Sequence, residues 1–557
     1  MGIPKLVSML QPWASRHQLS NTHEAGEASI FLRHADEARG DIRDAVGSLG
    51  PTAREAIIDG PALSYHAYGI AVASRNNASH ALDALPSYRE VNAIVLDCLS
   101  LLESYGFRVV AVFFDGILPS SKEPTRFERL NSSRKQLERF RSNTPSLIAE
   151  PGKGRKLTPR LPFSFSRGQD KLKALPALPF LVPAAIEALN ESRYRFQTRV
   201  VPAEADVYCA KYASLHGGGT IFTSDSDLLV YDMTEKSNIV LFKDIELIGN
   251  NSVHKRISEW IHLAIPNHVL HPTTFSNAVA SGTKTIDFAD KVLDMYLPFS
   301  IDDPMRATCW NLSIPIRQMA YSILKPGKHI TDEWTRRGQR IGEKKVDHLS
   351  AEEVVDRLQT QMNLLSSVRG QIDDQVLVWR FMGLYSICAE LVDEEKLLPK
   401  REVLVKLLKG SSGGKDWGLV HLGAQMEAVL YSWRMLWQCC RVQQALREKG
   451  TLNPDIDDAV NGISGILNSM PGIADLFDPT LLLESAVESA LEYLWSVLGI
   501  EDPGVKPEER EDVDGFRAAN RKRKKRRKEE LKNKLPVTKA AKVPKTSNLF
   551  DVLGVER

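Results

Sequence analysis

The chain has 557 residues, 43% of them hydrophobic, so it is long enough for two or three domains with extensive cores. It shows no recognisable signal peptide and no run near the roughly 18 apolar residues that span a bilayer, so no membrane association is expected. The six cysteines show no metal-ligand spacing, which argues against a disulfide framework and predicts a reducing compartment. The formal net charge of +2 conceals an asymmetry: residues 521–545 contain 13 Lys or Arg and two Glu, and the rest of the chain is acidic.

The first 250 residues alternate apolar strands with amphipathic helices, which is typical of a parallel α/β sheet flanked by helices. We expect strands that end at Asp59 and just before Asp115, and further strands at Tyr194–Val200 and 220–223. We expect helices at 1–14, Pro61–Ile70, Val91–Tyr105, Lys122–Arg141, Ala184–Leu189 and Pro202–His216, the last with Pro202 as its first residue. Residues 142–183 are rich in proline and basic residues and are expected to be an irregular insertion.

Residues 251–500 change in character, because long helical patterns rich in Leu, Val and Trp dominate them. We expect helices at Ser350–Ser367, Asp373–Leu397, Trp417–Glu448 and Leu481–Leu498. These patterns predict a second, all-helical domain. Residues 501–557 are highly charged and are expected to form a disordered basic tail.

Acidic residues stand at the carboxyl ends of the predicted strands. Ligands of open α/β sheets bind beyond these strand ends, so the acids should share one rim. Carboxylates that converge in this way repel one another unless cations lie between them, and Mg²⁺ or Mn²⁺ suits such oxygen ligands. Two such ions would suit attack of water on a phosphodiester. The candidate metal ligands are Asp59, Asp115, Glu204, Asp206, Asp225 and Asp227.

Each acid also has a purely structural interpretation. Asp59 and Asp115 precede glycine, and Asp-Gly is an ordinary turn. Glu204 and Asp206 lie in a predicted first helical turn, where the helix dipole favours acids. Asp225 and Asp227 could be loop residues that cap the next helix. The metal hypothesis therefore depends on the four junctions occurring together.

Five short motifs resemble those of the XPG/flap-endonuclease superfamily, in the same order along the chain. They are Met1-Gly-Ile-Pro-Lys-Leu, Ile57-Ile-Asp-Gly, Phe113-Phe-Asp-Gly, Pro202-Ala-Glu-Ala-Asp and Thr223-Ser-Asp-Ser-Asp. The form Ile-Asp-Gly-Pro-Ala-Leu-Ser-Tyr-His looks most like the asteroid branch. The resemblance covers about residues 1–245 and implies a PIN-like nuclease core that binds two Mg²⁺ ions.

The resemblance also implies roles for basic and aromatic residues. The family's catalytic Lys and Arg follow the second aspartate by seven and fourteen residues, which are Lys122 and Arg129 here. Nearly two helical turns separate them, so both could clamp one phosphate; the alternative is a solvated helix surface. Tyr65 matches a tyrosine that stacks on a base near the cut, although it could instead face the core. Further nucleic-acid contacts are expected from Gly2, Arg126 and Arg134.

Two family features are missing from the sequence. Family nucleases carry a seventh carboxylate in a Gly-x-Asp-Tyr segment and a glycine-rich helix–two-turn–helix that grips duplex DNA. The corresponding residues 275–288 contain neither pattern, and nothing supports Asp287 or Asp290 as substitutes. The alternative hypothesis is therefore a catalytically impaired PIN-like scaffold that binds RNA or proteins in gene regulation.

The leading hypothesis is a nuclear, Mg²⁺- or Mn²⁺-dependent nuclease that cuts single-stranded, flapped or 5′-ended DNA, with a role in DNA repair. Its partners would be such DNA, or RNA. The basic run Arg521–Lys528 predicts a nuclear import signal and an import-receptor partner, although a solubilising tail is an alternative. The partner of the helical domain is left open.

Overall fold

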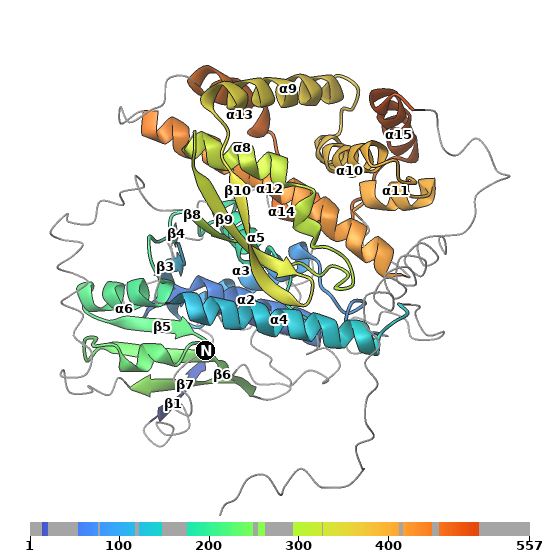
Figure 1. Cartoon of the computed structure of the whole chain (residues 1–557). Coiled ribbons are helices and arrows are strands. Elements are labelled where there is room, and N and C mark those ends of the chain that lie inside the picture. The colour runs from blue at the N-terminus through green and yellow to red at the C-terminus, as the bar shows by residue number, and fades with distance from the viewer. Residues whose placement is uncertain are drawn as a thin grey trace, which may run out of the picture. The chain divides into compact units, whose positions relative to one another are not determined.

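The computed structural model describes part of the chain, and Figure 1 shows its secondary structure. The described residues are 14–20, 54–75, 78, 80–116, 122–147, 175–248, 254–261, 293–325, 327–410, 416–447 and 456–500. Residues 1–13 of the predicted helix at 1–14, residues 148–174 of the insertion and the basic tail lie outside these ranges, and Ala14 is in a strand.

A seven-stranded sheet forms the first half of the structure, with the order β1-β7-β6-β5-β2-β3-β4 (Figure 1). Five neighbouring strands, β6 to β4 in this order, are parallel, and β7 and β1 are added antiparallel at one edge. The strands are β1 (Ala14–Ser20), β2 (Arg54–Asp59), β3 (Phe107–Phe114), β4 (Thr198–Val200), β5 (Gly219–Thr223), β6 (Ser237–Ile248) and β7 (His254–Ile261). The predicted parallel α/β sheet is confirmed.

The central strands are apolar throughout because both faces of the sheet are covered. Ala56 and Ile58 pack with residues of α2 (Gly60–Ala73), α3 (Tyr88–Ser104) and α5 (Leu181–Asn190). Ile57, which points to the opposite face, packs with residues of α6 (Ala205–Leu215). The continuous apolar runs at 56–58 and 109–114 are therefore explained by burial of both faces of the sheet.

The helix boundaries follow local capping signals. Asp59 caps α2, and a capping box of Ser87 and Glu90 starts α3. Gly106, with φ of 81°, ends the turn after α3, because this left-handed conformation suits glycine. The prediction that Pro202 begins a helix is wrong: α6 begins at Ala205, and Glu204 is its N-cap. Val201 extends the pairing of β4 with β3 instead, since its N–H donates to the Phe114 carbonyl oxygen at 2.9 Å.

The second region, which comprises the described residues between 293 and 500, contains most of the remaining helices. They are α8 (Ile314–Leu324), α9 (Ala351–Arg369), α10 (Gln375–Asp393), α11 (Arg401–Leu408), α12 (Trp417–Arg447), α13 (Asp457–Leu467), α14 (Ile473–Phe477) and α15 (Glu484–Leu498). A short 3₁₀ turn lies at Cys309–Asn311, and another lies at Asp227–Val230 in the first region. The four predicted helices correspond to α9, α10, α12 and α15, and the predicted capping box of Ser350 and Glu353 is present.

The second region is not exclusively helical, which corrects one part of the prediction. The strands β8 (Leu293–Tyr296), β9 (Ile330–Arg337) and β10 (Arg340–Asp347) form a sheet with the order β10-β9-β8. These strands contain many charged residues, so the pattern of hydrophobic residues did not indicate them. Glu333 on β9 is 1% exposed because Arg317 of α8 pairs with it at 2.5 Å, and Tyr321 donates a hydrogen bond to it.

Helix α10 is long and apolar enough to cross a membrane by length and composition alone, although no such run was expected. Ten of its residues are buried in the protein core, and Arg380 among them donates to the backbone carbonyls of Leu408, Leu476 and Asp478. This packing is typical of a core helix.

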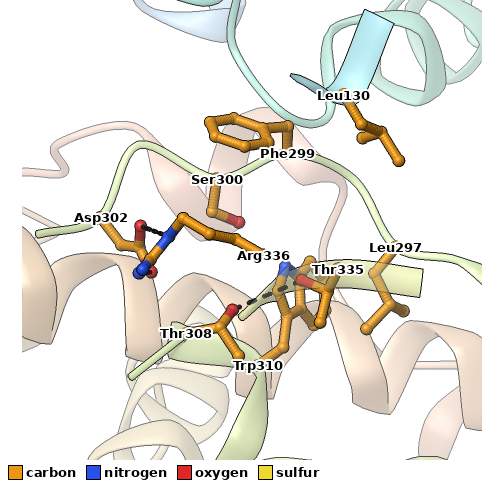
Figure 2. Close-up of a pocket in the computed structure, with 9 residues that line it drawn as sticks. All are labelled: Leu130, Leu297, Phe299, Ser300, Asp302, Thr308, Trp310, Thr335 and Arg336. Atoms are coloured by element: carbon orange, nitrogen blue, oxygen red, sulfur yellow. Dashed lines mark hydrogen bonds and ion pairs between the residues drawn. The ribbon is translucent and has the colours of Figure 1, made fainter. Parts of the chain in front are cut away.

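The described residues before Asp502 belong to one compact unit, and the two regions contact each other within it. Asp478 accepts hydrogen bonds from the backbone N–H groups of Tyr88 and Arg89 at the start of α3. Helix α4 (Glu123–Asn143) also packs on the second region, through Leu137, Phe140 and Phe127. Figure 2 shows Leu130 of α4 and Phe299 among the side chains that line a small cavity, together with the ion pair of Arg336 and Asp302. The predicted division near residue 250 stays a prediction.

Candidate nucleic-acid and metal site

Asp59 is a buried acid at the carboxyl end of β2, with an exposed fraction of 6%. One carboxylate oxygen accepts the Ala62 N–H at 3.1 Å, and the other accepts the Thr223 hydroxyl at 2.6 Å. Burial raises the pKa of Asp59 to about 7, and the nearby charges of Asp115 and Asp206 raise it further. The cap of α2 is therefore also the most strongly perturbed acid of the rim.

Asp115 follows β3 and joins it to the start of α6. Its carboxylate accepts the Ala205 N–H at 2.7 Å. Burial raises the pKa of Asp115, the charge of Glu204 raises it further, and Arg129 and Arg126 lower it. Asp115 thus lies among the acids of α6 and the arginines of α4.

Gly116 allows the close approach that brings these junctions together. Its N–H donates to the Ala203 carbonyl oxygen at 3.0 Å, and a Cβ atom added at residue 116 would lie 2.0 Å from the Val201 carbonyl oxygen. A side chain at this position would therefore push the segment before Glu204 away from Asp115. The Asp-Gly pair is more than a surface turn.

We expect Gly116→Ala to lower the free energy of unfolding by about 1–3 kcal/mol, because backbone atoms must move to remove this contact. Thermal unfolding measures this change, and the rearrangement should also reduce any nuclease activity of the rim. Gly465→Ala is the matched control, because nothing lies within 4 Å of a Cβ atom in that helical position. Equal stability of Gly116→Ala and the wild type would contradict the role of the close approach.

Glu204 and Asp206 lie at the start of α6. Glu204 is the N-cap residue, and Asp206 is in the first turn. Burial raises the pKa of Asp206 to about 6, with further contributions from the charges of Glu204, Asp115 and Asp225. Acids from three strand ends therefore act on one carboxyl group.

Thr223 links the ends of β2 and β5 and was not predicted as a site residue. It is fully buried, its hydroxyl donates to Asp59, and its oxygen accepts the Asp225 N–H at 2.9 Å. Asp225 in turn accepts the Asp227 N–H at 3.0 Å. The only local signal was a threonine that ends a strand immediately before Ser-Asp-Ser-Asp.

Tyr231 is a second residue that the sequence did not indicate. Burial raises the pKa of its phenol, and the charges of Asp206, Glu204 and Asp227 raise it further. Tyr231 therefore lies beside the same acids, just beyond the 3₁₀ turn at Asp227–Val230.

Lys122 and Arg129 lie at the rim with the acids. The Lys122 ammonium is 3.1 Å from a carboxylate oxygen of Glu204. Partial burial lowers the pKa of Lys122, but the hydrogen bond and charge of Glu204 outweigh it, and with Asp206 and Asp227 they raise the pKa overall. Arg129 acts on the titration of both Asp115 and Tyr65. The start of α4 thus supplies positive charge to the acids.

The other predicted contact residues have different surroundings. Tyr65 is 55% exposed on α2, so it does not face the core. Arg126 lies over the ring of Tyr296, 4.8 Å from its centroid. The structure does not bring Arg134 to the acids: its side chain is 11% exposed and pairs with Glu138 one turn along α4. Gly2 and residues 275–288 lie outside the described ranges.

The donor set fits hard divalent cations by its chemistry. The rim offers carboxylate oxygens, and burial, with a smaller contribution from the charges of neighbouring acids, raises the pKa values of Asp59, Asp115 and Asp206. Among the described residues, however, no three acidic, His or Cys side chains are close enough together to hold a metal ion. Metal binding would therefore require these side chains to move inward from their present hydrogen bonds.

Acids at four strand ends of a parallel sheet, next to a helix that carries Lys and Arg, form the arrangement that the sequence predicted for a PIN-like core. A family model described as XPG domain containing matches residues 177–277 and 266–348. The match spans less than half of the chain, and at this level it confirms the resemblance to the XPG/flap-endonuclease superfamily that was found in the motifs. The asteroid branch stays a prediction. No curated protein matches the chain.

Proposed function

We propose that the protein is a metal-dependent nuclease that hydrolyses phosphodiester bonds in single-stranded, flapped or 5′-ended DNA. The main support is the meeting of the acids with Lys122, whose ammonium pairs with Glu204 at 3.1 Å, and with Arg129, whose charge reaches Asp115. Acids alone would repel a phosphate, whereas this combination can hold cations and the phosphate together.

Under this proposal, two Mg²⁺ or Mn²⁺ ions are held by Asp59, Asp115, Glu204, Asp206, Asp225 and Asp227. When bound, such ions polarise the phosphate and favour ionisation of a water molecule. The cations would replace the Lys122 ammonium as the partner of Glu204, so that Lys122 can turn to a phosphate oxygen. Arg129, exposed on α4, can donate two parallel hydrogen bonds to the same group.

The substrate class follows from what surrounds the acids. Tyr65 offers an exposed ring, and stacking on a ring accepts any base. The basic side chains of α4 bind phosphates without reading bases. We therefore propose recognition of backbone and strand shape, with little preference for sequence.

The test is cleavage of labelled flap, single-stranded and duplex DNA by the purified protein in Mn²⁺ or Mg²⁺. We expect the flap and single-stranded substrates to be cut and EDTA to abolish the reaction. An inactive wild type that still binds nucleic acid or protein would instead favour the scaffold. That alternative is supported by the missing seventh-acid pattern and by the lack of a close three-acid group among the described residues.

We also propose that Arg521–Lys528 directs nuclear import. Deleting residues 521–528 from a fluorescent fusion should move most of the signal to the cytoplasm, because the basic cluster binds an import receptor. Deletion of residues 501–508 is a control of equal length. Nuclear signal that persists without the basic cluster would exclude this role.

A further inference from the structure

The first turns of α4 pack on aromatic side chains of the second region. The ring of Phe127 meets that of Trp334 edge-on, with centroids 4.5 Å apart, and lies 6.0 Å from that of Tyr296. Tyr296 of β8 and Trp334 of β9 are direct neighbours in the parallel register of the small sheet. Two adjacent strands from about 170 to 210 residues further along the chain therefore fix this part of α4.

Arg126 precedes Phe127 and extends this contact toward the acids. Its guanidinium carbon lies 4.8 Å from the centroid of the Tyr296 ring, while its charge reaches Asp115. A guanidinium stacked on an aromatic ring uses its face for that contact and keeps its N–H donors in the plane parallel to the ring. Arg126 can thus rest on Tyr296 and still present a fork of donors to a phosphate.

We propose that Arg126, seated on Tyr296, is a DNA phosphate-binding subsite next to the rim, and that Tyr296 is its positioning residue. This inference rests on the proposed nuclease function and deepens it. The site is built by both regions of the chain: α4 supplies the cation and the second region supplies the platform that orients it. Trp334 supports the platform through its stacking contact with Tyr296, at 6.3 Å between centroids.

The arrangement gives the second region a direct role in substrate binding. The two family features missing from residues 275–288 are ones that normally hold the substrate or the metals, and a phosphate contact beside the acids would replace part of that hold. Sequence patterns suggested Arg126 as a contact residue, but they gave no sign of Tyr296, because its register with Trp334 depends on the fold.

The test compares Arg126→Ala, Arg126→Lys, Tyr296→Leu and Tyr296→Phe in the full chain. The probe is a fluorescein-labelled single-stranded DNA of about 20 nucleotides, and its anisotropy gives the dissociation constant between 50 and 200 mM KCl without divalent ions. Loss of one phosphate contact reduces the slope of log K against log salt by about 0.7. The basic tail contributes equally to every protein compared.

We expect Arg126→Ala and Tyr296→Leu each to reduce this slope by about 0.7 and to weaken binding about fivefold or more at low salt. Tyr296→Phe keeps the ring and should behave as the wild type, whereas Arg126→Lys keeps the charge without the planar fork and should be intermediate. Arg141→Ala is the matched control, because Arg141 lies over Trp417 at 5.0 Å further along the same helix. We expect it to leave the slope unchanged.

Thermal unfolding of each variant identifies losses that come from the fold alone. The proposal is overturned if the wild type does not bind the probe, if Arg126→Ala keeps the wild-type slope, or if Tyr296→Leu and Tyr296→Phe behave alike. Single-turnover cleavage in Mn²⁺ separates this result from the proposed function. If the wild type is inactive but its DNA binding depends on Arg126, the subsite is supported and the nuclease function is rejected. If the wild type is active but its DNA binding does not depend on Arg126, the nuclease function is supported and the subsite is rejected.

Discussion

Alanine at Asp115 and Asp227 together is expected to reduce the rate of Mn²⁺-dependent DNA cleavage by about a thousandfold or more, equivalent to about 4 kcal/mol. The physical reason is the position of Asp115, between the end of β3 and the start of α6 and within reach of the charges of Arg126 and Arg129. Asp227 adds a carboxylate beside Lys122. Removal of both would take away two of the proposed ligands and lower the negative charge around Lys122, Arg126 and Arg129.

The design must separate chemistry from folding, because Asp115 also accepts the Ala205 N–H. Asp115→Asn keeps an acceptor for this hydrogen bond and loses the charge, so we expect a folded protein with little activity. Glu55→Ala is the matched control: Glu55 lies at the amino end of β2, where it pairs with Arg108 at 2.6 Å, on the rim opposite the acids. Double-variant cleavage at the wild-type rate would exclude the rim as the active site.

The central strands and many helices could be predicted because their signals are local. Residues 109–114 form a short run of apolar, mostly β-branched or aromatic residues that ends at an Asp-Gly pair, and these local features together favour a strand buried on both faces. Ser350 and Glu353 predict the start of α9 because a capping box involves only neighbouring residues. The convergence of acids could also be predicted, since all carboxyl ends of parallel strands lie on one edge.

The elements that were missed depend on partners far away in the chain. Glu333 can be buried in β9 because Arg317 of α8 pairs with it. The residues around Glu333 do not indicate this pairing, so the charged side chain argues against a buried strand when the sequence is considered alone. β6 was overlooked because its apolar run at 239–242 is followed by charged residues. Pro202 misled for a related reason: the N1 preference competes with extension of β4, and the hydrogen bond from Val201 to Phe114 decides the outcome.

The site shows the same division between local and distant causes. Tyr65 could be proposed because it follows Asp59 by six residues in the sequence, but only the structure shows that its side chain is exposed. Thr223 and Tyr231 have no pattern of their own, because their importance lies in contacts with acids from other junctions. Sequence analysis therefore identified the charges of the site better than the neutral groups that hold them.

Asparagine at Asp59 is expected to make the metal-free protein more stable at pH 8 while abolishing cleavage. Asp59 has a pKa of about 7 in the folded protein and 3.8 as its ordinary value, so the folded state binds its proton more tightly. The free energy of unfolding therefore falls as pH rises from about 4 to about 7, by up to about 4 kcal/mol at about 1.4 kcal/mol per pKa unit. Asparagine removes this buried charge, and its amide can keep a hydrogen bond to Ala62.

Thermal unfolding in EDTA at pH 4 and pH 8 measures the effect. The variant should exceed the wild type by about 3–6 °C in Tm at pH 8 and match it closely at pH 4. Mg²⁺ should raise the Tm of the wild type at pH 8 and leave the Tm of Asp59→Asn nearly unchanged, because the ion replaces the proton as the partner of the carboxylate.

Thr223→Val is the opposite control: loss of the hydroxyl that donates to Asp59 leaves the charge less stabilised and should lower the Tm at pH 8. If Asp59→Asn is no more stable than the wild type at pH 8, the charge of Asp59 does not destabilise the folded protein. The electrostatic argument for a cation beside Asp59 would then fail.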